Sequence, residues 1–265
     1  MVDVADLLTD LADESAEVDA MVAPLSDVDW SRPTPAAGWT IAHQVAHLAW
    51  TDHATLLAAT DPDAFAAHLW TAAASSDGFV DRGAEEYLAP PAELLARWRA
   101  GRVALSETLG GLPPGTRLPW YAGPMSVAST VTARLMETWA HGLDIAEALG
   151  HTRPPTARLR HIAHLGARTV ANGFLAHGHQ APVEPVRVEL TGPDGDLWTF
   201  GPEDAADRVT GSALDFCLLV TQRRHRADTD LVATGPVADA WLDVAQVFAG
   251  PPGSGRPPGP PGGGP

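Results

Sequence analysis

Two pairs of side chains in this sequence have the types and the spacing of ligands for a divalent metal ion. His43 and His47 are four residues apart, and so are Glu137 and His141. Residues with this spacing lie on the same side of an α-helix. When two such helices face each other in a bundle, imidazole and carboxylate groups can hold an ion such as zinc and leave one coordination position for water or substrate. The chemistry indicated is that of a catalytic metal centre.

The same residues also fit a purely structural explanation. The chain contains 11 histidines, so a pair with this spacing arises easily by accident, and Glu137 could form an ion pair with Arg134 on the surface. The neighbours of Glu137 favour the metal site, because Ala133, Ala140 and Leu143 form an apolar stripe beside it. A glutamate buried there costs free energy unless it is paired or bound to a metal.

Apolar residues at helical spacing and capping signals indicate the helices that must position these side chains. Thr40 is a plausible N-cap, Pro91 suits a first helical turn, and Gly110 and Gly150 suit helix ends. The predicted long helices span about residues 2–23, 40–59, 90–110 and 126–149, and a short helix lies within 62–82. Four long helices with intervening loops predict a helical bundle over residues 1–153.

The pattern changes after Pro154 and Pro155. A helix is expected within 156–177, and a β-hairpin follows over residues 186–200, with alternating apolar residues on either side of a Pro-Asp-Gly-Asp turn. Further helices are expected at about 211–222 and 236–249. We therefore predict an α+β protein that is mainly α, with a small α+β domain at 154–249. The Gly/Pro-rich residues 250–265 are predicted to be a disordered tail.

Composition excludes several classes of function. The chain has 265 residues and a formal net charge of −16, which disfavours nucleic acid or an anionic membrane as the main partner. All 17 basic residues are arginine, and the lack of lysine excludes Schiff-base chemistry and a Walker-type phosphate loop. One cysteine, no signal-peptide pattern and no long apolar run favour a cytoplasmic protein without a membrane span.

Three segments resemble a known family. They match the DinB-like, mycothiol-dependent maleylpyruvate isomerases, and the third matches an actinobacterial branch described as metal-binding. The segments are AAGWTIAHQVAHLAWTD (36–52), ARLMETWAHGLDIAEALG (133–150) and RVTGSALDFCLLVTQRRHRADTDLVATGPVADAWLDVAQVFAGPPG (208–253). The resemblance implies that the first domain is a DinB-like four-helix bundle. It covers nearly the whole chain except the tail.

The resemblance also implies a ligand set of His47, Glu137 and His141 for a divalent metal, with zinc as the expected ion. His43 falls where relatives more often carry an acidic residue, so a fourth ligand, a group orienting a ligand and a general base are all open roles for it. Related isomerases place a functional arginine in the C-terminal domain, which makes Arg223 a candidate for binding a substrate carboxylate. Neutralisation of a helix C-terminus is the alternative for Arg223.

Asp144 is a further candidate, because it lies three residues after His141 and could orient a ligand or move a proton. A solvated helix charge is an equally good explanation. Cys217 has apolar neighbours and no activating base nearby in the sequence, so we expect it in the core.

Three hypotheses for function follow. The leading one is a metal-dependent isomerase or S-transferase that acts on a small molecule with mycothiol as cosubstrate. A second is a thiol-independent metalloenzyme, such as an isomerase, cyclase or hydrolase. The third is a non-catalytic module that binds a metal or ligand, which a closed site with four protein ligands would favour. The sequence is compatible with a monomer or a homodimer.

Overall fold

The computed structural model describes residues 3–74, 78–121, 123–250, 252–253 and 255–259. The chain divides into two compact units, Met1–Arg153 and Pro154–Pro265. The fold is mainly helical α+β, as the sequence predicts. No helix in the described part of the chain is long and apolar enough to cross a membrane.

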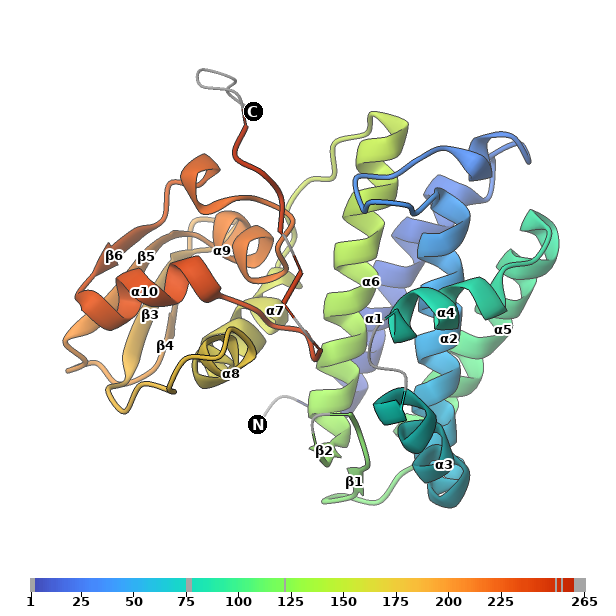
Figure 1. Cartoon of the computed structure of the whole chain (residues 1–265), viewed down its shortest axis with the longest axis horizontal. Helices are drawn as coiled ribbons and strands as arrows, with labels where there is room; N and C mark the ends of the chain where they lie inside the picture. Colours follow the sequence, from blue (N-terminus) through green and yellow to red (C-terminus); the bar gives the residue numbers. More distant parts are fainter. Residues whose placement is uncertain (1–2, 75–77, 122, 251, 254, 260–265) are drawn as a thin grey trace. The chain divides into compact units, whose positions relative to one another are not determined.

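The first unit is built on long helices that lie side by side (Figure 1). They are α1 (Val4–Val22), α2 (Ile41–Thr60), α5 (Pro91–Gly110) and α6 (Val127–Leu149). Helix α1 packs on α6, and α2 packs on both α5 and α6. The smaller elements are η1 (Asp29–Ser31), α3 (Pro62–Ala74), α4 (Phe79–Tyr87) and the strands β1 (Arg117–Leu118) and β2 (Met125–Ser126). The predicted single helix within 62–82 is thus replaced by α3 and α4, both of which pack on α2.

Local signals start and stop these helices where the sequence predicts. The Ser126 hydroxyl accepts a hydrogen bond from the backbone N–H of Ser129 at 3.2 Å, which satisfies one of the free donors in the first turn of α6. Gly150 ends the same helix with φ of +69°, a left-handed conformation that glycine adopts without strain.

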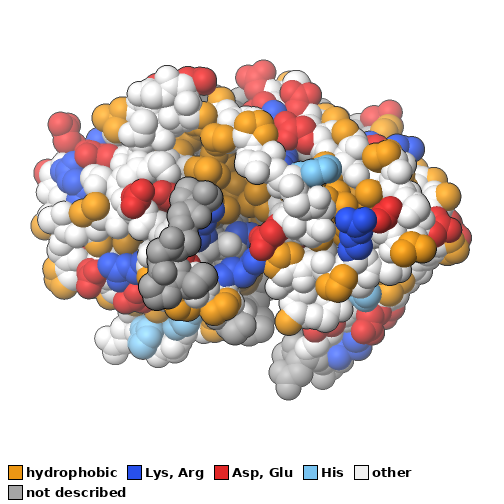
Figure 2. All heavy atoms as spheres, turned by 90° about the horizontal axis from the view of Figure 1, so that it is seen from above, with side chains coloured by type: hydrophobic (Ala, Val, Ile, Leu, Met, Phe, Trp, Pro, Cys, Tyr) orange, Lys and Arg blue, Asp and Glu red, His pale blue; other side chains and the backbone are white. Residues whose placement is uncertain are grey.

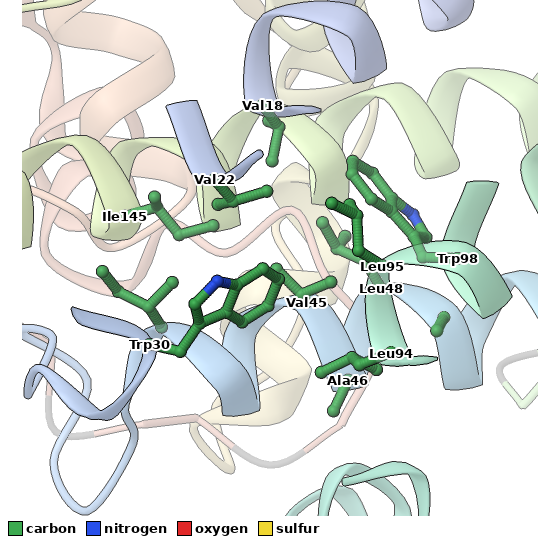
Figure 3. Packing of buried hydrophobic residues seen from close by; sticks show 12 residues of the cluster. Val18, Val22, Trp30, Val45, Ala46, Leu48, Leu94, Leu95, Trp98 and Ile145 are labelled. Atoms are coloured by element: carbon green, nitrogen blue, oxygen red, sulfur yellow. The ribbon is translucent and has the colours of Figure 1, made fainter. Parts of the chain in front are cut away.

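The core of this bundle draws side chains from all of its long helices (Figure 3). Trp30 of η1 is 3% exposed and packs among them. Burial of large apolar side chains is the main stabilising contribution, about 1.5 to 3 kcal/mol for each. The buried members of the cluster are Val18, Val22, Trp30, Ile41, Val45, Ala46, Leu48, Ala49, Leu94, Leu95, Trp98 and Ile145.

The second unit combines a mixed sheet with short helices (Figure 1). Its strands are β3 (Val186–Thr191), β4 (Leu197–Phe200), β5 (Asp207–Ser212) and β6 (Val232–Thr234), in the sheet order β4-β3-β5-β6. The predicted hairpin is the antiparallel pair β3 and β4. Strand β5 pairs with β3 in parallel and with β6 in antiparallel orientation. The helices are α7 (Leu159–Arg168), α8 (Val170–Ala176), α9 (Ala213–Val220), η2 (Arg226–Asp228) and α10 (Pro236–Val244).

Strands β5 and β6 are absent from our sequence prediction. The helix expected from residue 211 begins at Ala213, because residues 207–212 join the sheet. Asp207, the first residue of β5, accepts hydrogen bonds from the backbone N–H groups of Val237 and Ala238 at 2.7 and 2.9 Å. This carboxylate therefore caps α10 from a distant strand, a contact that local patterns do not encode.

The predicted helix within 156–177 is interrupted at Thr169. The predicted disorder of 250–265 stays a prediction, because residues 251, 254 and 260–265 lie outside the described part of the chain. Within that segment, the backbone N–H of Gly259 donates to Asp228 at 2.8 Å. On the face shown in Figure 2, acidic side chains are dispersed among basic and uncharged ones and do not form one patch.

Candidate metal centre

His47, Glu137 and His141 come together where α2 packs against α6. One nitrogen or oxygen atom from each lies within 4.8 Å of the others, and this group could hold a metal ion. Oε2 of Glu137 lies 3.2 Å from Nε2 of His47 and 3.2 Å from Nε2 of His141. The two imidazole rings have centroids 4.4 Å apart. The structure thus brings together the three residues that the family resemblance singles out.

This cluster is largely removed from water. His47 and His141 are 5% and 9% exposed, and the Glu137 side chain is 21% exposed. Burial raises the pKa of Glu137, but hydrogen bonds to His141 and His47 and the charges on those rings outweigh it, so the pKa of Glu137 lies well below its usual range. The carboxylate is therefore ionised and suited to bind a cation.

Two tryptophans flank the cluster. The Trp39 ring stacks on His141 at a centroid distance of 5.9 Å and lies 5.3 Å from His47, and its indole N–H donates to Asp81 of α4 at 2.8 Å. The Trp50 ring is 5.7 Å from His47 and packs directly on Gly83, where an added Cβ would lie 2.4 Å from the indole. Helix α4 is therefore held against the aromatic walls of the site.

Arg134 pairs with Asp52 and not with Glu137. The ion pair of the structural explanation, between Glu137 and Arg134, is therefore wrong. The Nε of Arg134 donates to Asp52 Oδ1 at 3.0 Å, and the two side chains are 2% and 7% exposed. Asp52 belongs to α2 and Arg134 to α6, so a buried ion pair joins the same two helices that carry the cluster. Glu137 is left to interact with the two histidines.

Gln44, which is fully buried on α2, is a member of the site that the sequence did not predict. Its Oε1 lies 2.5 Å from Nδ1 of His141. An uncharged amide next to two histidines carries no signal by itself, and the partner is 97 residues away in the chain. Gln44 lies three residues before His47. This spacing was the one indication in the sequence that the two side chains face the same side of the helix.

The other candidates have diverse surroundings. Asp144 is 2% exposed on α6, so it is not the solvated charge that the alternative explanation required. Arg223 belongs to the second unit, where its Nη1 donates to the carbonyl oxygen of Thr221 at 2.9 Å. Catalytic roles for both residues stay predictions.

His43 lies in the first turn of α2 and contributes to its N-terminal cap. Its Nδ1 accepts a hydrogen bond from the backbone N–H of Thr40 at 3.3 Å and lies 2.8 Å from the Thr40 hydroxyl. An acidic residue at the third helical position makes the same bond in a capping box. This contact gives a physical reason why His43 can replace an acidic residue, and His43 is not part of the three-residue cluster.

We expect His43→Ala to lower the free energy of unfolding by about 1 kcal/mol, the usual cost of a lost cap, and to lower the melting temperature by roughly 2–4 °C. His43→Asp should restore the cap, and zinc content should match the wild type in both variants. Circular dichroism melts and metal analysis by plasma mass spectrometry measure the two effects. Metal loss in His43→Asp at an unchanged melting temperature would instead show that the imidazole itself serves the centre.

Comparisons with known proteins found family models and relatives of this chain. A family model described as the mycothiol maleylpyruvate isomerase N-terminal domain matches residues 11–146, and one described as wyosine base formation matches residues 182–234. Two uncharacterized proteins of Mycobacterium tuberculosis, from strains CDC 1551 / Oshkosh and ATCC 25618 / H37Rv, are each 55% identical over 257 residues, which is 97% of this chain and 100% of theirs.

Two solved structures are similar in fold. They are crystal structures of the mycothiol-dependent maleylpyruvate isomerase and of a histidine-to-alanine mutant of it. Each has a TM-score of 0.59 and 14% identity, and the match covers 88% of this chain and 93% of that chain. At 14% identity, this similarity establishes a shared fold. The chemistry has to be inferred from the residues of the site.

Proposed function

The chain belongs to the mycothiol maleylpyruvate isomerase family by its N-terminal domain, and on that premise we propose that it is a divalent-metal-dependent isomerase or S-transferase that uses mycothiol on a small molecule. The observation that carries the proposal is the convergence of His47, Glu137 and His141 within 4.8 Å. Without that cluster, the family relation would indicate the fold alone.

The residues present fit a divalent ion, with zinc the best candidate. Two imidazoles and one carboxylate are a ligand set of catalytic zinc sites, which keep a further position open. The carboxylate oxygen lies at the same distance, 3.2 Å, from a nitrogen of each ring, so one ion could contact all three side chains. An ion bound by these residues would lower the pKa of a coordinated thiol or water, or polarise a substrate carbonyl.

The chain's own residues prepare the site for this chemistry. Glu137 supplies a fixed negative charge, and the low exposure of the two histidines keeps the local dielectric low, which strengthens electrostatic interactions. Trp39 and Trp50 exclude water on two sides and hold the imidazole rings in place by packing. Asp144, His43 and Arg223 are proposed to assist in proton transfer or substrate binding.

The reactive thiol must come from outside the protein. Cys217 is fully buried, its Sγ donates to the carbonyl oxygen of Leu159 at 3.5 Å, and burial raises its pKa far above the usual range. Such a thiol is inert at neutral pH. Addition of an external thiolate to a carbon–carbon double bond, rotation about the resulting single bond and elimination of the same thiolate would isomerise an unsaturated acid. Addition without elimination would transfer the thiol.

The direct test is calorimetric titration of the zinc-loaded protein with mycothiol, followed by turnover assays on unsaturated carboxylic acids. We expect binding to require the metal and to be unaffected by Cys217→Ala. Turnover without any thiol would support the second hypothesis, a thiol-independent metalloenzyme. Stoichiometric metal with neither thiol binding nor turnover would support a binding module. A role with reduced thiols also favours a cytoplasmic location.

A further inference from the structure

We infer that Gln44 is a positioning residue that holds a hydrogen on Nδ1 of His141, so that Nε2, the nitrogen beside Glu137, is the one available to a metal ion. The inference concerns the site of the proposed function and rests on that function for its meaning. It assigns a role to a residue outside the three-residue cluster. A buried chain of hydrogen bonds from Thr34 to His141 determines where this hydrogen lies.

The chain of hydrogen bonds starts at a backbone carbonyl. The carbonyl oxygen of Trp39 can only accept, and the Thr34 hydroxyl donates to it at 3.0 Å. A hydroxyl has one hydrogen, so the same oxygen must accept from its other neighbour. That neighbour is the Gln44 amide nitrogen, which donates to the Thr34 hydroxyl at 2.8 Å. The orientation of the Gln44 amide is thereby determined.

With its nitrogen directed to Thr34, Gln44 presents its carbonyl oxygen to His141. Oε1 of Gln44 lies 2.5 Å from Nδ1 of His141, and a carbonyl oxygen has no hydrogen to give. His141 must therefore carry hydrogen on Nδ1. Nε2, the nitrogen 3.2 Å from Glu137, is then the atom that can bind a metal ion, in exchange for the hydrogen that it donates to the carboxylate in the metal-free protein.

His47 provides an internal comparison, because its ring lacks such a partner. Nδ1 of His47 is buried and has no hydrogen-bond partner among the described residues. Trp39 and Trp50 hold this ring by packing, which does not select a tautomer. Loss of the Gln44 amide should thus change the proton position on His141 and leave that on His47 unchanged.

The first readout is the position of the histidine ring hydrogens in metal-free protein, measured by long-range ¹H–¹⁵N NMR correlation of ¹⁵N-labelled rings. We expect a hydrogen on Nδ1 of His141 in the wild type. In Gln44→Leu that hydrogen should be lost from Nδ1, and the ring should keep the one on Nε2 that Glu137 accepts. Gln44→Glu keeps an acceptor oxygen and should keep the wild-type signal. The matched control is Thr55→Val, because Thr55 is a fully buried polar residue of the same helix whose hydroxyl donates to Thr51 within α2.

The second readout is zinc affinity by competition with a chelator. Gln44→Leu should weaken zinc binding by about 10- to 100-fold, as loss of a partner of a metal ligand does, while Gln44→Glu and Thr55→Val stay within a few-fold of the wild type. Circular dichroism checks that each variant is folded. A retained Nδ1 hydrogen and unchanged affinity in folded Gln44→Leu would overturn the inference. If wild-type protein binds no zinc but Gln44→Leu still loses the Nδ1 hydrogen, the proposed function fails and the role of Gln44 stands.

Discussion

Glu137→Ala is expected to remove the metal from the protein while leaving its helices intact. Wild-type protein should hold about one zinc ion per chain, as a mononuclear site does, and the variant close to none after dialysis. Glu137 carries the one negative charge among the three clustered side chains, and its Oε2 is the atom common to both short contacts. The loss of affinity should exceed the roughly 10- to 100-fold effect of removing an outer partner, and turnover should fall below detection.

Plasma mass spectrometry measures the metal, and circular dichroism measures the helix content. Glu147→Ala is the matched control, because it makes the same substitution at an exposed position of α6. Stoichiometric metal in Glu137→Ala would refute the ligand assignment. A triple variant in which His47, Glu137 and His141 are alanine should also be free of metal. If reconstituted wild-type protein contains none either, this branch has kept the fold and lost the metal chemistry.

The second large effect is expected at the buried ion pair of Asp52 and Arg134. Asp52→Ala or Arg134→Ala should destabilise the first unit by about 3–5 kcal/mol, because each leaves an uncompensated buried charge. Arg134 is especially sensitive, since its Nη2 has no hydrogen-bond partner among the described residues even in the intact pair. Denaturant unfolding, followed by a signal from the first unit, measures the change.

Apolar replacement of both partners should recover most of the lost stability. Burial raises the pKa of Asp52 above its usual value even though Arg134 lowers it. Folding therefore disfavours the ionised form of Asp52 relative to the unfolded chain. Asp52→Leu combined with Arg134→Met should therefore approach wild-type stability. Glu93→Ala, which breaks the exposed pair with Arg97, is the control and should cost less than about 1 kcal/mol. A double variant as unstable as the single ones would show that this ion pair stabilises the bundle.

Much of the fold could be predicted because helices are encoded locally. Apolar spacing and capping residues predicted α1, α2, α5 and α6 to within a few residues, and the hairpin followed from alternation around a turn. The i,i+4 spacing predicted which ligands share a helix face. Strands β5 and β6 could not be predicted in this way, because β5 is polar in part and pairs in parallel with β3, although β4 lies between them in the chain.

Sequence alone thus determined the helical class, the family resemblance and the two candidate pairs of ligands. Tertiary structure decided how these residues are used: His43 caps a helix, Arg134 pairs with Asp52, and Gln44 orients His141. The physical reason is that a side chain's partner across two helices depends on the register and separation at which they pack. The hydrogen-bond direction through Gln44 follows from contacts between residues up to 97 positions apart, and no local pattern in the chain carries that information.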